Sequence, residues 1–164
     1  MPNPLVLTLL AIGAALTAFA PLVAAQQPSC ARWDVAKVQR EEGRQWTASV
    51  CTPRKTRDAL LEIVCAGGDL NIRYQPVLRD GTDPADGMRD FDFAMSSGTR
   101  RVALGFEGLD GAFATDLDRR HPLFEMLMSG DRLRIRDTRG AVATHSYTLA
   151  GSRKALTKLM AQCR

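Results

Sequence analysis

The feature that most constrains the fold is the C-terminal stretch, which reads as a strand followed by a short helix that ends in a cysteine. The strand-like run extends from Val142 to Leu149, and the turn Gly151-Ser152 separates it from the helix. The apolar side chains of the helix recur with helical spacing and therefore share one face. They are Ala155, Leu156, Leu159, Met160 and Cys163. A cysteine on this buried face predicts that the end of the chain is tied to the sheet beneath it.

The first 25 residues contain no charged side chain and predict an export signal. From Leu5 to Ala25 they are almost continuously apolar, and Val23 and Ala25 place small residues at the −3 and −1 positions of a cleavage site. We therefore predict a signal peptide over 1–25, cleaved near Ala25, and one periplasmic or secreted domain over 26–164. The run is also long enough to span a bilayer, so the alternative is an uncleaved membrane anchor.

Four cysteines, Cys30, Cys51, Cys65 and Cys163, follow this segment, and an even number in an exported chain favours disulfides over free buried thiols. Cys65 lies on the apolar face of a predicted strand, as Cys163 does on its helix, so we predict that these two pair. Cys51 points away from the apolar face of its strand and Cys30 begins the domain, so they form the second predicted pair. No metal site is predicted, because the chain has no C-x-x-C motif.

Alternating apolar residues predict roughly seven or eight short strands, most of them joined by hairpin-length turns. Three hairpins are predicted, over residues 31–51, 60–75 and 90–107. The short internal helix is expected to be capped by Asp116 or Asp118, to have Pro122 in its first turn, and to stop at Gly130. The fold class is therefore a β-rich α+β fold, in which hairpins build an antiparallel sheet or sandwich, with this internal helix, a C-terminal helix and disulfide ties. The candidate strands are residues 31–39, 46–51, 60–65, 70–75, 90–96, 101–107, 132–136 and 142–149, and residues 112–115 are a weaker candidate.

Two patterns that resemble functional sites are better explained otherwise. The loop over 79–89 contains Asp80, Asp83 and Asp86, but their spacing does not match an EF-hand, so we assign them to turn chemistry rather than to calcium. His121 and His145 belong to no recognisable triad, and no nucleotide-binding or hydrolase motif is present. The sequence thus predicts no catalytic residues and no cofactor, and we expect that the chain is not an enzyme.

Two surface features are candidates for binding. Arginines alternate outward along two predicted strands, and if these strands are neighbours they form a basic stripe for an anionic partner such as lipid headgroups or polysaccharide; an ordinary solvated sheet face is the alternative. These arginines are Arg73, Arg132, Arg134 and Arg136. The internal helix is apolar nearly all round, which indicates either core burial or docking on a protein partner. Its candidate contact residues are Leu123, Phe124, Leu127 and Met128. Nucleic acid is not predicted, because no aromatic residue interleaves with the arginines.

The segments "HPLFEMLMSGDRLRIR" and "YTLAGSRKALTKLMAQC" carry a resemblance to a known group of proteins. With the exported start, they resemble small exported bacterial proteins of the invasion-associated locus B type and the VasI-like proteins associated with type VI secretion. The shared ending is an aromatic or apolar strand, a Gly-Ser turn, an Ala-Leu helix and a late cysteine, here Tyr147, Leu149, Gly151, Ser152, Ala155, Leu156, Leu159 and Cys163. The two N-terminal cysteines depart from this pattern.

This resemblance implies a periplasmic or surface accessory protein without a catalytic site to carry over. We therefore expect a non-catalytic protein that binds an envelope or secreted protein. Binding of an anionic ligand through the arginines is the alternative, and a small hydrolase with an unrecognised site is the second alternative.

Overall fold

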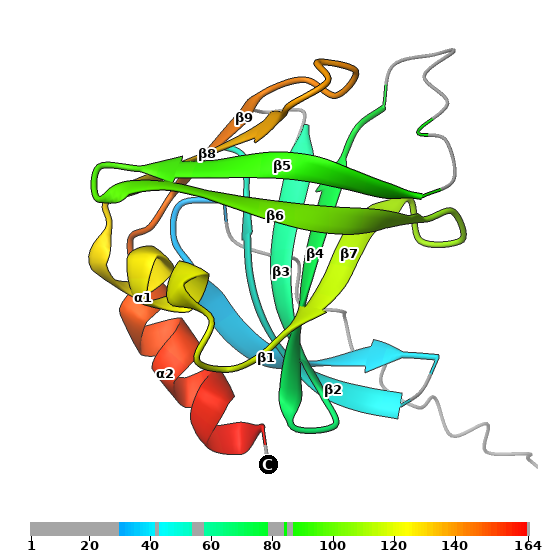
Figure 1. Cartoon of the computed structure of the whole chain (residues 1–164). Coiled ribbons are helices and arrows are strands. Elements are labelled where there is room, and N and C mark those ends of the chain that lie inside the picture. The colour runs from blue at the N-terminus through cyan, green and yellow to red at the C-terminus, as the bar shows by residue number, and fades with distance from the viewer. Residues whose placement is uncertain (1–29, 42, 54–57, 79–83, 85–86, 164) are drawn as a thin grey trace, which may run out of the picture.

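In the computed structural model, the described residues are 30–41, 43–53, 58–78, 84 and 87–163, and they form nine antiparallel strands in one sheet and two helices. The strand order is β1-β2-β3-β4-β7-β6-β5-β8-β9. Figure 1 shows that both helices lie together on one side of this sheet. The strands are β1 (Asp34–Arg40), β2 (Gly43–Cys51), β3 (Ala59–Ala66), β4 (Asp69–Pro76), β5 (Met88–Met95), β6 (Gly98–Glu107), β7 (Ala112–Leu117), β8 (Arg132–Asp137) and β9 (His145–Thr148). The helices are α1 (Pro122–Ser129) and α2 (Ser152–Gln162).

The predicted antiparallel fold with one internal and one C-terminal helix is confirmed, and the sheet form rather than the sandwich is the one observed. The three predicted hairpins are β1–β2, β3–β4 and β5–β6. Two pairings join strands that are distant in sequence, β4 with β7 and β5 with β8. The last strand is shorter than predicted, because the preceding residues form a loop held by Asp137, whose carboxylate accepts the backbone N–H groups of Arg139, Ala141 and Val142.

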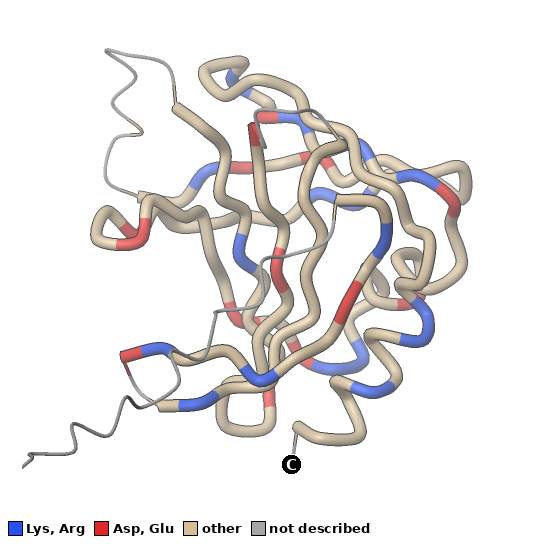
Figure 2. The backbone as a smooth tube through the Cα atoms, turned by 180° about the vertical axis from the view of Figure 1, so that it is seen from behind, with Lys and Arg blue, Asp and Glu red and all other residues tan. Residues whose placement is uncertain are grey.

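The two ends of the sheet are brought together by Trp33. Its backbone N–H donates to the carbonyl of Ala150 at 2.9 Å, and its indole Nε1–H donates to the carbonyl of Thr148 at 3.0 Å. Thr148 is the last residue of β9 and Ala150 follows this strand, whereas Trp33 directly precedes β1. The sheet therefore curls until its first and last strands approach each other. Seen from behind, basic and acidic positions are distributed over the whole backbone rather than gathered in one region (Figure 2).

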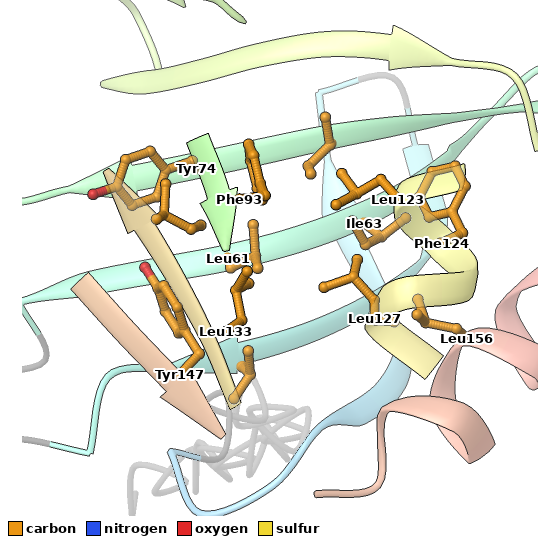
Figure 3. Close-up of a cluster of buried hydrophobic side chains, with 14 of the residues drawn as sticks. Leu61, Ile63, Tyr74, Phe93, Leu123, Phe124, Leu127, Leu133, Tyr147 and Leu156 are labelled. Atoms are coloured by element: carbon orange, nitrogen blue, oxygen red, sulfur yellow. The ribbon is translucent and has the colours of Figure 1, made fainter. Parts of the chain in front are cut away.

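The hydrophobic core lies between the inner face of this curled sheet and α1. Alternating residues of β3, β4, β5 and β8 point into it, and Leu123, Phe124 and Leu127 of α1 pack against them with exposed fractions of 0–1% (Figure 3). Met128 is half-buried against the same cluster. The excess of apolar residues in α1 is therefore explained by the core, and these residues do not form the docking face that was the other interpretation of the pattern.

The start of α1 differs from the prediction. Asp116 belongs to β7 and Asp118 to the following turn, where its side chain accepts the N–H of Arg120 at 2.7 Å. The N-cap is His121, whose Nδ1 accepts the N–H of Leu123 at 3.3 Å. The predicted stop at Gly130 is confirmed, and a Cβ there would lie 2.9 Å from Leu149 Cδ1, so a larger residue would require the leucine side chain to shift.

Helix α2 packs beside α1 and against β1 and β2. The Ser152 hydroxyl donates to the Leu127 carbonyl at 2.7 Å, which joins the first turn of α2 to the body of α1. The Lys158 ammonium lies 5.3 Å from the centroid of the Trp46 ring, on β2, in cation–π geometry. These contacts place Cys163, at the end of α2, next to the sheet.

Candidate functional site

The four cysteines form the two predicted disulfides, and they are structural ties. Cys30 pairs with Cys51, with Cα atoms 4.4 Å apart, and Cys65 pairs with Cys163, with Cα atoms 5.3 Å apart. No free cysteine is found among the described residues. Stable disulfides fit an oxidising, exported environment. They fasten the N-terminal end of the domain to β2 and the C-terminal helix to β3.

The predicted stripe of four arginines is wrong, because its two strands are not neighbours. Arg73 lies on β4, and three strands, β7, β6 and β5, separate it from β8. Instead of joining the others, Arg73 pairs with acidic groups of its own surroundings, with Glu107 at 2.7 Å and with Asp110. Strand order depends on long-range pairing, which alternation within one strand does not reveal.

The remaining three arginines do share an exposed surface, and a fourth that the alternation pattern did not single out joins them. Arg101 on β6 and Arg136 on β8 flank Asp92 on β5 and donate to its two carboxylate oxygens at 2.9 and 2.6 Å. We call Arg101, Arg132, Arg134 and Arg136 the arginine face. The signal for Arg101 was present in the β5–β6 hairpin, because the register places it directly opposite Asp92.

The electrostatics of this face divide the arginines into two kinds. The hydrogen bond from Arg101, together with Arg136, lowers the pKa of the Asp92 carboxyl, so this buried acid is ionised and fixes both guanidinium groups. Arg132 and Arg134 are exposed and form no ion pair within the part of the chain that the structure describes. Their charges are therefore available to a ligand.

A second charged arrangement crosses the outer face of β1, β3, β4 and β6. Arg40 pairs with buried Glu62 at 2.8 Å, Glu62 is opposite Arg73 in the β3–β4 register, and Arg73 pairs with Glu107 and Asp110. We call this the charge row, because basic and acidic side chains follow one another along it. A groove of about 430 Å³ lies along it. Its lining residues are Gln39, Arg40, Glu41, Gln45, Arg73 and Asp110.

A polar cluster is buried at one end of the core, where Figure 3 shows the hydroxyls of Tyr74 and Tyr147 on the same side. The Tyr74 hydroxyl lies 2.5 Å from His145 Nδ1 and 3.3 Å from the Ala143 carbonyl oxygen. Burial, reinforced by the negative charge of Asp137, raises the pKa of Tyr74 far above its usual value. The hydroxyl is therefore neutral, and it can donate its one proton along the shorter contact to an unprotonated Nδ1 of His145.

Several residues singled out from the sequence form no site in the described structure. Asp80, Asp83 and Asp86, and the predicted signal peptide over 1–25, lie outside the described residues. Within the described ranges, no three or more His, Cys, Asp or Glu side chains are grouped as metal ligands. The same ranges hold no helix long and apolar enough to cross a membrane.

Comparison with known proteins supports the fold. No family model matches the sequence, and no curated protein matches it. The chain is similar in structure to invasion associated protein B from Bartonella henselae, whose crystal structure superposes with a TM-score of 0.55 at 12% sequence identity. The match covers 79% of this chain and 91% of the other. The chain thus shares the overall fold of that protein, in agreement with one part of the resemblance drawn from its C-terminal segments.

Proposed function

We propose that this chain is an exported, non-catalytic accessory protein that binds an anionic ligand of the cell envelope through the arginine face. The signal peptide predicted from the sequence, cleaved near Ala25, would place it in the periplasm or outside the cell. The observation that carries the proposal is the pair Arg132 and Arg134, which are exposed and lack acidic partners among the described residues. An Arg guanidinium presents several fixed donors that match phosphate and carboxylate groups.

The fixed pair beside them supports this assignment. Because Asp92 holds Arg101 and Arg136 in place, their remaining donors are oriented before a ligand arrives, which lowers the entropic cost of binding. Despite these ion pairs, 61% of the Arg101 side chain and 59% of the Arg136 side chain remain exposed. An acidic surface of an envelope or secreted protein is the second candidate partner, because arginine is enriched at protein interfaces.

The test is binding of the mature chain to vesicles that contain anionic phospholipid, and separately to an acidic polysaccharide, with neutral phosphatidylcholine vesicles as reference. Near an anionic surface each arginine contributes about 1 kcal/mol. The double variant Arg132→Glu/Arg134→Glu should therefore weaken binding by at least about 30-fold. Binding of the wild type should also fall as salt is added.

The matched control is Arg44→Glu/Lys154→Glu, which makes the same change in net charge at exposed positions on β2 and α2. This control should lose much less affinity than the β8 variant. Equal losses in both variants would show that net charge alone drives binding. Binding to neither anionic probe would leave the acidic protein surface as the candidate and would contradict the ligand class proposed here.

A further inference from the structure

Beside the ion pairs of Asp92, the arginine face has one position without a bulky side chain of its own. Arg101 and Arg136 come from the two strands that flank β5, and both hydrogen-bond Asp92, so both guanidinium groups reach over β5. The next residue of β5 on the same face is Ala94, about 7 Å further along the strand. Its side chain is a single, half-buried methyl group, so a bound group can rest above it.

Hydrogen-bond donors lie beside Ala94 on three sides. In the register of the sheet, Thr99 of β6 is opposite Ala94 on one side, and Arg134 of β8 is opposite it on the other. Both of these side chains are exposed, and neither has a hydrogen-bond partner in the described part of the chain. The two guanidinium groups that Asp92 holds border the third side. We call the surface above this alanine the Ala94 position.

The guanidinium groups that border the Ala94 position keep most of their donors for a ligand. A guanidinium group has five N–H donors, and Arg101 and Arg136 use only their Nε–H and Nη2–H groups on Asp92. The other donors of these two arginines, and all those of Arg134, remain. Because three guanidinium groups border one position, the ligand that uses them best has three acceptor oxygens on one centre.

The charge of the surroundings distinguishes between classes of anion. The four guanidinium groups of the arginine face are opposed by two carboxylates on the same face of β5, Asp90 and Asp92, which leaves a balance of two positive charges. A phosphate monoester has three terminal oxygens and a charge of about −1.5 to −2 at neutral pH. A phosphate diester or a carboxylate has two such oxygens and a single charge, so it meets fewer donors and leaves one positive charge uncompensated.

We propose that the ligand group recognised by the arginine face is a phosphate monoester, bound at the Ala94 position between Arg101, Arg134 and Arg136. This inference rests on the proposed function, and it narrows the anionic ligand to one chemical class. A lipid headgroup and a soluble phosphorylated molecule share this chemistry, so the experiment has an arm for each source.

The first arm is an NMR titration of the ¹⁵N-labelled mature chain at neutral pH with methyl phosphate, a monoester, and with dimethyl phosphate, a diester. Methyl phosphate should bind about tenfold more tightly, because it brings one more charge and one more terminal oxygen. It should shift the amide signals of the residues around the Ala94 position, which are Ala94, Thr99, Arg101, Arg134 and Arg136.

The decisive variant is Ala94→Leu, which fills the Ala94 position and changes no charge. It should remove the preference for methyl phosphate over dimethyl phosphate. The matched control is Ala103→Leu, which adds the same bulk at a half-buried alanine of β6 opposite Asp90, and it should keep the preference. If Ala94→Leu disturbs the fold, Arg134→Lys keeps the charge of an exposed residue, loses the planar fork and should weaken methyl phosphate binding more than dimethyl phosphate binding.

The second arm compares vesicles of phosphatidic acid, a monoester, with vesicles of phosphatidylglycerol, a diester. Preference for phosphatidic acid would support a lipid source, whereas preference for methyl phosphate with equal binding to both vesicles would support a soluble one. Binding to phosphatidylglycerol without any preference for methyl phosphate would overturn this inference and leave the proposed function standing. Binding to none of these probes would overturn both. Equal effects of Ala94→Leu and Ala103→Leu would overturn the location assigned to the phosphate.

Discussion

At the scale of single residues, the Asp137 side chain accepts four hydrogen bonds at the end of β8. Its buried carboxylate accepts the N–H groups of Arg139, Ala141 and Val142 at 2.8–3.0 Å and pairs with Arg89 at 2.9 Å. Burial by itself would raise the pKa of Asp137, but these hydrogen bonds and the Arg89 charge lower it below its usual value. The loop that joins β8 to β9 depends on this one ionised group.

Replacement of Asp137 by Asn should therefore destabilise the fold by about 3–5 kcal/mol at neutral pH, because Arg89 is left buried without its counter-charge. Since the folded-state pKa of Asp137 is lowered, its contribution is present above the unfolded pKa of about 3.9 and is lost as the pH falls through the folded pKa. The difference between wild type and Asp137→Asn should thus narrow toward acidic pH. Urea unfolding at a series of pH values measures this difference.

Asp131 supplies the control for this prediction. It is exposed and directly precedes β8, at the end opposite Asp137, and Asp131→Asn should change the free energy of unfolding by no more than about 0.5 kcal/mol. An Asp137→Asn variant as stable as this control would contradict the role assigned to the carboxylate. This role could not be predicted from sequence, because an aspartate at the end of an alternating strand looks the same whether its carboxylate meets water or a loop's N–H groups.

At the scale of elements, α1 shows what a hydrophobic pattern leaves open. Its end was predicted from Gly130, its start was placed too early at Asp116 or Asp118, and its apolar character was plain from the sequence. That character fits both core burial and docking on a partner, since both require apolar side chains. Leu123 and Leu127 are fully buried because the curled sheet provides a surface on one side and α2 covers another.

The burial of α1 predicts a large effect of Leu127→Ala. Removing a fully buried leucine side chain should lower the free energy of unfolding by about 2–5 kcal/mol. The matched control is Leu109→Ala at the β6–β7 turn, where the leucine is fully exposed and its loss should change stability by no more than about 0.5 kcal/mol. Denaturant titrations of both variants measure the contrast. Comparable stabilities would mean that α1 is not part of the core.

The pairing of the strands also shows what local sequence patterns can and cannot predict. Local alternation and turn residues were enough to predict the three hairpins, because their pairing is decided within a short stretch of chain. The pairings of β4 with β7 and of β5 with β8 join segments far apart in sequence, and no local pattern specifies them. Those pairings decide which arginines are neighbours, so Arg73 was misplaced and Arg101 was overlooked.

At the scale of the whole molecule, the two disulfides act on very different lengths of chain. Cys30 and Cys51 are 21 residues apart, whereas Cys65 and Cys163 are 98 residues apart. The second disulfide could be placed from sequence because both cysteines lie on apolar faces that must meet in the core. It closes a loop that contains β4 to β9 and both helices, so it reduces the conformational entropy of the unfolded chain more than the first disulfide does.

In the chain-entropy model, the long loop contributes about 4.7 kcal/mol and the short one about 3.4 kcal/mol. Cys65→Ala/Cys163→Ala should therefore destabilise the fold by about 1 kcal/mol more than Cys30→Ala/Cys51→Ala. It should also release α2, because the bond fastens the end of that helix to β3. Guanidinium unfolding compares the two variants, and hydrogen exchange of the α2 amides reports the release. Equal destabilisation of the two double variants, with unchanged hydrogen-exchange protection of the α2 amides, would contradict the idea that the second disulfide holds α2 on the sheet. The packing of α2 on β1 and β2 would then be what holds the helix in place.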